Sequence, residues 1–197
     1  MSDNVKAPRR KVLVLGHSFI TRLSRYANEL PSRANLGLHH DVVEYHGFPG
    51  AGINRIYREF SRRFRGSGFD VVCLQCGGND LSCPSADPDT VVQEICTFVD
   101  WLVQSCGVQT VAVCKLFFRA STQAHKGDVS VHVYNERVSR VNTFLAQRLC
   151  CPQTIFWDHR RSIWDVFSLL NADGVHLRDQ KPYYRSIKSC VLFALGS

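Results

Sequence analysis

The sequence predicts one α/β domain, a three-layer α/β/α sandwich around a central parallel sheet of about five strands. Two observations predict this fold class. Short apolar runs recur along the chain, and several are rich in Val and Ile, as is typical of strands covered on both faces. Helical patterns separate consecutive runs, and strands separated in this way form parallel sheets with helices on both sides through right-handed crossovers.

The apolar runs predict five strands. The first run ends at Gly16, and a helical pattern begins at once, with Ser18 at its start. The other four strands are expected within residues 41–47, 69–78, 109–118 and 153–158, the last run being the weakest.

Helical periodicity predicts four further helices, at residues 53–66, 87–107, 131–149 and 180–195. The pattern at 87–107 is the clearest. Asp87 or Asp89 can cap its start, Pro88 suits the first helical position, and Gly107 is placed to end it. We expect Tyr183 and Tyr184 to pack the last helix. The longest irregular stretch, residues 119–130, is a candidate loop over a site.

Length and composition indicate a single folded domain. With 197 residues, 45% of them hydrophobic, the chain can bury a substantial core. We expect a basic N-terminal tail at residues 1–10 and one domain at residues 11–197, present as a monomer. No apolar run reaches the ~20 residues of a membrane-spanning helix, and no secretory signal is recognisable, so a cytoplasmic or nuclear location is expected.

Nine cysteines are present, and without an export signal we expect them to be reduced thiols. Cys73 and Cys76 form a CxxC pattern, but they lie in the predicted strand at 69–78. Residues three apart in a strand point to opposite faces, so these thiols are poorly placed to share a metal ion. We therefore interpret the cysteines as small core residues and expect neither a metal nor a cofactor.

The formal net charge is +7, and much of the excess lies on the predicted helix at 53–66. Apolar residues recur there at helical spacing, and the opposite face carries an arginine stripe, defined as Arg55, Arg58, Arg62 and Arg65. Such stripes are common on solvated helix faces, which is the interpretation we favour. A weak contact with nucleic acid or another acidic partner is the alternative.

Small and polar residues gather where ligands of an open parallel sheet bind, beyond the carboxyl ends of the strands. Ser18 follows the first predicted strand, the glycine-rich segment 47–52 follows the second, and Asn79 follows the third. Asp173 and His176 come after the fifth strand, three residues apart around a glycine. Each group stands where a purely structural role would favour an apolar residue.

These residue types predict a hydroxyl-activating site. A single turn can place the carboxylate of Asp173 beside the imidazole of His176, which fixes the imidazole tautomer and leaves the other ring nitrogen to accept a proton from Ser18. The Ser18 N–H, a glycine N–H from residues 47–52 and the Asn79 amide could stabilise an oxyanion. Arg119 and residues 120–130 either line the pocket or are exposed to solvent.

The segments GHS, GFPGAG, GGND and DGVH resemble, in order and spacing, the four blocks of the SGNH (GDSL-like) hydrolase family. The resemblance extends from about residue 12 to 190 and implies a flavodoxin-like fold with Ser18 as the nucleophile. It also implies that Asp173 and His176 are its partners and that Gly50 and Asn79 complete the oxyanion hole, with Gly52 as the alternative glycine. The chain departs from the family at His17, where Asp is frequent.

The stretch at 156–187 looks like animal SGNH domains associated with retrotransposon-type elements. A standard α/β-hydrolase is disfavoured, because no GxSxG motif is present. We expect a serine esterase that acts on carboxylic, acetyl-type esters of a small molecule, glycan or lipid. The alternative is a weak or inactive binding or adaptor domain, associated with nucleic acid within a mobile-element protein.

Overall fold

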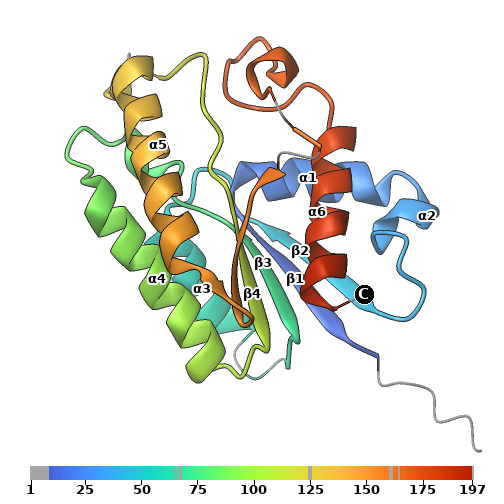
Figure 1. The fold of residues 1–197 in the computed structure, drawn as a ribbon. Coiled ribbons are helices and arrows are strands. Elements are labelled where there is room, and N and C mark those ends of the chain that lie inside the picture. Colours follow the sequence, from blue (N-terminus) through green and yellow to red (C-terminus); the bar gives the residue numbers. More distant parts are fainter. Residues whose placement is uncertain are drawn as a thin grey trace, which may run out of the picture.

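A computed structural model describes residues 9–64, 66, 68–123, 126–159, 162–163 and 165–196. The described residues form one six-stranded sheet in the order β2-β1-β3-β4-β6-β5 (Figure 1). Five of the strands run parallel: β1 (Lys11–Gly16), β2 (Val42–Gly47), β3 (Val71–Gln75), β4 (Thr110–Cys114) and β6 (Thr154–Trp157). The short β5 (Cys150–Cys151) is antiparallel to β6. The predicted parallel sheet of about five strands is confirmed.

Helices cover both faces of the sheet (Figure 1). On one face lie α1 (Ser18–Asn28) and α6 (Lys181–Ala194), with α2 (Pro31–Ala34) beside α1; on the other lie α3 (Ile53–Arg63), α4 (Pro88–Gln104) and α5 (Val131–Arg148). Two short 3₁₀ turns, η1 (Asp80–Ser82) and η4 (Phe167–Leu169), occur in the connections. The predicted three-layer sandwich is therefore confirmed.

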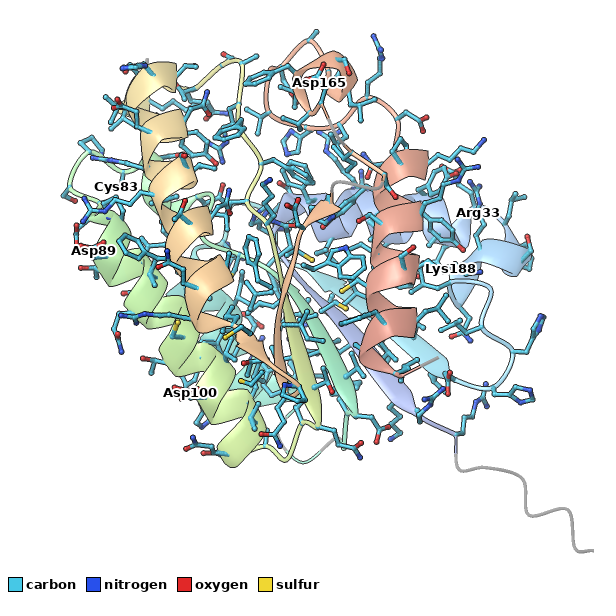
Figure 2. All side chains as sticks on the ribbon, in the orientation of Figure 1. Arg33, Cys83, Asp89, Asp100, Asp165 and Lys188 are labelled. Carbon is cyan, nitrogen blue, oxygen red and sulfur yellow. The ribbon has the colours of Figure 1, made fainter. Side chains whose placement is uncertain are left out.

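Successive side chains of each strand point to opposite faces of the sheet, which divides the core into two parts. Leu13 and Leu15 of β1 pack with α3, α4 and α5, whereas Val12 and Val14 pack with α1 and α6. Side chains fill both interfaces, and charged residues such as Asp89 lie on the outer side of the helices (Figure 2). A sheet buried on both faces explains why its strands appear in the sequence as continuous apolar runs.

Two glycines allow α1 to begin directly at the end of β1. A Cβ on Gly16 would lie 2.2 Å from the carbonyl oxygen of Gln75, and a Cβ on Gly47 would lie 2.3 Å from the backbone nitrogen of Thr21. Real Cβ atoms do not approach other atoms so closely. The glycines thus let the first turn of α1 cross the ends of β2 and β3 in close contact.

The helix-end signals act as the sequence predicts for α4. The Asp87 carboxylate accepts the Thr90 N–H at 2.9 Å, and Pro88 is the first helical residue. Gly107 follows the helix with φ of 71°, in the left-handed region that favours glycine. The helix ends three residues earlier than its apolar pattern suggests.

The two thiols of the CxxC pattern face opposite sides of the sheet, as predicted. Cys73 packs with α6, where its Sγ lies 3.5 Å from Cys190 Sγ, and Cys76 packs in the core on the other face. Burial raises the pKa of the Cys76 thiol. Among the described residues, no group of three His, Cys, Asp or Glu side chains is arranged to hold a metal ion.

The N-terminal tail expected at residues 1–10 falls mostly outside the described residues, which begin at Arg9. Arg10 contacts the domain through several hydrogen bonds; among them, its Nε donates to Asp41 Oδ1 at 3.1 Å, and its Nη1 donates to the carbonyl oxygen of Leu195 at 2.7 Å. None of the helices in the described part of the chain has the length and apolar character needed to cross a bilayer.

Candidate active site

Ser18 is the first residue of α1, and only His17 separates it from the end of β1. It is half-buried, while the neighbouring His17 and Phe19 are buried. The backbone N–H groups of a first helical turn have no acceptor within the helix, so they favour negative charge near the Ser18 side chain.

Asp173 and His176 lie in a tight turn that their own hydrogen bonds stabilise. Asp173 Oδ1 accepts the backbone N–H groups of Val175 at 2.9 Å and His176 at 2.8 Å. Gly174 has φ of 65°, and a Cβ there would lie 2.6 Å from the Ser121 backbone nitrogen. Glycine is thus required at position 174 both by the backbone conformation and by the close approach to the 120–121 segment.

The structure brings the three predicted side chains into one hydrogen-bonded chain. Ser18 Oγ lies 2.8 Å from His176 Nε2, and His176 Nδ1 lies 2.9 Å from Asp173 Oδ2. A carboxylate only accepts hydrogen bonds, so the proton of the neutral imidazole is assigned to Nδ1 and Nε2 is left to accept from the serine hydroxyl. This is the arrangement in which an imidazole can take a proton from a nucleophile.

Asp173 is held in its ionised form. Partial burial alone would raise its pKa, but the N–H groups of His176 and Val175 and the imidazole outweigh that effect and lower the pKa to about 2. A guanidinium nitrogen of Arg22 lies 3.9 Å from Asp173 Oδ2. The carboxylate can therefore orient the imidazole and stabilise its cation throughout the neutral pH range.

A cavity of about 460 Å³ opens next to Ser18. Gly50, Asn79, Arg119 and His176 are among its lining residues, together with Ser121–Gln123 of the predicted loop over the site. Gly50 has φ of 70° and lines the cavity, whereas Gly52 caps the start of α3 and packs against Asp80. The structure thus gathers Ser18, Gly50 and Asn79, the predicted oxyanion-hole residues, around one space.

Asn79 is oriented by two hydrogen-bond partners, one an acceptor and the other a donor. Its Nδ2 donates to the Ala51 carbonyl at 3.0 Å, and its Oδ1 accepts from Arg119 Nη2 at 3.3 Å. Arg119 is only 7% exposed and lines the cavity, which settles the question that the sequence left open between a lining and an exposed position. Its contact with Asn79 was not anticipated, because a lone arginine after a strand gives no signal of it.

His17 is buried beside Ser18 and also lines the cavity. Burial first, and then the nearby charges of Arg119 and His176, lower its pKa to about 3. The imidazole is therefore neutral at physiological pH. No hydrogen-bond partner for its Nδ1 is found among the described residues.

Three members of the arginine stripe lie in the described part of the chain, and one of them, Arg62, is in an ion pair. Arg55 and Arg58 are exposed on α3, but Arg62 Nη2 donates to Glu59 at 2.8 Å. Arg65, the fourth member, lies outside the described residues. A nucleic-acid contact through this stripe stays a prediction.

Tyr183 of α6 is fully buried, and its hydroxyl donates to Gln75 Oε1 at 3.0 Å. Tyr184 is half-buried, and its hydroxyl donates to the Arg33 carbonyl at 3.2 Å. The predicted packing role of both tyrosines is confirmed.

No protein-family model and no curated protein matches the sequence. Solved structures do match the fold over nearly the whole chain. A GDSL-like lipase from Bacteroides thetaiotaomicron is 12% identical, with 95% of this chain and 88% of that chain covered and a TM-score of 0.67. A carbohydrate acetylesterase family member from Sinorhizobium meliloti is 18% identical, with 95% and 100% covered and a TM-score of 0.64.

An acetylxylan esterase from Geobacillus stearothermophilus is 12% identical, with 96% of this chain and 95% of that chain covered and a TM-score of 0.59. At these identities the likeness concerns the fold alone. The chain therefore has the fold of GDSL-like hydrolases, the fold that the sequence motifs led us to expect.

Proposed function

We propose that this protein is a serine esterase that hydrolyses short-chain carboxylic esters, acetyl esters above all, through Ser18, His176 and Asp173. One observation carries the proposal: the three side chains form a continuous hydrogen-bonded chain, 2.8 Å and 2.9 Å at its two links, that opens into a 460 Å³ cavity. The fold shared with acetylesterases and lipases supports the same reaction class.

The proposed reaction begins when His176 Nε2 takes the hydroxyl proton as Ser18 Oγ attacks the ester carbonyl. The oxyanion of the tetrahedral intermediate is stabilised by the N–H groups of Ser18 and Gly50 and by the Asn79 amide. His176 then returns the proton to the leaving alcohol, which gives an acyl-serine. A water molecule deprotonated by the same imidazole releases the acid and restores Ser18.

The cavity wall mixes polar and apolar side chains. Ser82, Arg119, Thr122 and Gln123 line it together with the apolar Phe19, Pro49 and Val175. We propose p-nitrophenyl acetate as the test substrate because the fold is shared with acetylesterases.

The test compares the wild type with Ser18→Ala on p-nitrophenyl acetate. We expect kcat to fall by about 10⁴-fold or more, because no nucleophile remains to form the acyl-enzyme. Ser24→Ala on the same helix is the matched control and should retain wild-type kcat. Undiminished turnover by a folded Ser18→Ala protein would remove Ser18 from the mechanism, and absence of turnover in the wild type would overturn the esterase proposal.

A further inference from the structure

Arg119 is a buried cation whose described neighbours include no acidic side chain at ion-pair distance. Its side chain is 7% exposed, and no carboxylate in the described part of the chain lies within 4.0 Å of its guanidinium. The side-chain donors bond to neutral acceptors instead: Nη1 to Ser82 Oγ at 2.7 Å, and Nη2 to the Gly78 carbonyl at 3.1 Å and Asn79 Oδ1 at 3.3 Å. Burying an unpaired charge is costly, so its presence beside the cavity calls for a functional reason.

The guanidinium is held rigidly. Its centre lies 4.2 Å from the ring centroid of Tyr134, a cation–π contact. The Arg119 backbone is clamped by Asn135, whose Oδ1 accepts the Arg119 N–H and whose Nδ2 donates to the Arg119 carbonyl, both at 2.9 Å. The end of this long side chain, whose Nη2 contacts Asn79, is therefore held in place.

Arg119 also determines which way the Asn79 amide faces. A guanidinium can only donate, so it must face the amide oxygen, and the Ala51 carbonyl can only accept, so it must face the amide nitrogen. The amide orientation is thus fixed at both ends, and the second hydrogen on Nδ2 is left for the cavity that Asn79 lines. A positively charged donor bonded to the amide oxygen also polarises the amide and makes its N–H a stronger donor.

We propose that Arg119 is a positioning residue that fixes and polarises Asn79 so that its amide donates to the oxyanion of the transition state. The inference rests on the esterase function proposed above. Such an arrangement favours the tetrahedral state over the bound ester, because the amide donor meets full negative charge only after attack. Arg119 acts through Asn79 and does not itself touch the substrate oxygen.

The experiment measures kcat and KM for p-nitrophenyl acetate, and the Ki of a trifluoromethyl ketone that forms a tetrahedral adduct, in Arg119→Met, Asn79→Ala and the double variant. We expect Arg119→Met to lower kcat about 100-fold, as loss of one oxyanion donor does, with KM within about threefold of wild type. The Ki should rise by a factor similar to the loss in kcat. The double variant should lose at most about threefold more than Asn79→Ala alone, because both changes remove one interaction.

Arg137→Met is the matched control. Arg137 donates to the carbonyls of Leu81, Cys83 and Pro84, so it supports the neighbouring segment as Arg119 does, without lining the cavity. It should retain wild-type kcat. If Arg119→Met does not fold, Arg119→Lys is measured in its place. Lysine keeps the positive charge but lacks the planar guanidinium with its several donors, so kcat should fall at least tenfold.

Three results overturn the inference alone. The first is a folded Arg119 variant with wild-type kcat, and the second is a double variant in which the two losses multiply in full. The third is a lower melting temperature of Arg119→Met with no rise in the inhibitor Ki, which is what a purely structural role would give. Absence of any Ser18-dependent turnover in the wild type overturns the esterase function, and the role of Arg119 falls with it.

Discussion

We expect two buried histidines to make the fold sensitive to mild acid. His17 and His159 are 3% and 2% exposed, and burial is the main cause that lowers the pKa of each to about 3. The ordinary pKa of histidine, 6.5, applies in the unfolded chain. Between these values the unfolded state binds more protons than the native state. The contribution of the two histidines to the unfolding free energy is therefore fully present above about pH 6.5 and is lost as the pH falls.

The magnitude follows from the two pKa values. At pH 5 the unfolded imidazole is almost fully protonated, and the native one is not, which costs about 2 kcal/mol of unfolding free energy per histidine. The figure hardly changes if the native pKa is 4 in place of 3, because the native imidazole is neutral at pH 5 in both cases. Together the two groups should cost about 4 kcal/mol, a large share of the stability of a domain this size.

Urea unfolding at pH 7 and pH 5, followed by tryptophan fluorescence, measures the effect. In His159→Gln the difference in unfolding free energy between the two pH values should shrink by about 2 kcal/mol, because one titrating group is gone. His132→Gln is the control, since the His132 side chain is 83% exposed and should leave the pH dependence unchanged. An unaltered pH dependence in His159→Gln, or an imidazole of His17 or His159 that titrates above pH 5 by NMR, would refute the reasoning.

Three further predictions follow from the site and its supports. Asp173→Asn should lower kcat for an acetyl ester by about 10³- to 10⁴-fold, because an amide donor facing Nδ1 of His176 reverses the imidazole tautomer; a loss below tenfold in steady-state kinetics contradicts the proposed relay. Gly16→Ala should destabilise the fold by about 1–3 kcal/mol by thermal unfolding, because the new Cβ meets the Gln75 carbonyl, and an unchanged melting temperature argues against that clash. Arg58→Gln should leave kcat/KM unchanged, whereas oligonucleotide affinity that depends on salt and falls in this variant would support the nucleic-acid hypothesis.

The layers of the fold could be predicted because burial on both faces leaves a strong sequence pattern. The strand ends could not, because apolar character continues past them. Leu116 and Phe117 follow β4 and remain 2% and 8% exposed, although they belong to a loop. Burial of a loop against helices gives the same sequence signal as burial of a strand.

The antiparallel β5 and the four-residue α2 were not predicted. Cys150 and Cys151 are two exposed residues, too few for any periodicity, and they pair with β6 only because the chain turns back at the edge of the sheet. Helix α2 begins at Pro31 after an extended Leu30 and is as short as a turn. Elements of this size depend on tertiary contacts and carry little local signal.

The candidate site, like the fold, has a part that the sequence could predict and a part that it could not. Asp173 and His176 are close in sequence, so local geometry could place them together, and the order of motifs along the sheet indicated Ser18. The bonds of Arg119 connect it to Gly78, Asn79 and Ser82, which lie 37 to 41 residues away. A contact between single residues so far apart has no pattern that a sequence can show.

The turn that carries Asp173 and His176 leaves the fold with one alignment to maintain. Asp173 and His176 lie together in one loop, whose start and end are joined by a bridge between Leu170 and Leu177. In the proposed mechanism, the alignment of His176 with Ser18 then depends on how that loop lies against the start of α1. In that mechanism, a variant or a denaturant that shifts the loop by an ångström or two would prevent proton transfer from Ser18 to His176, while every helix and strand stayed intact. Loss of activity on heating should therefore precede loss of secondary structure.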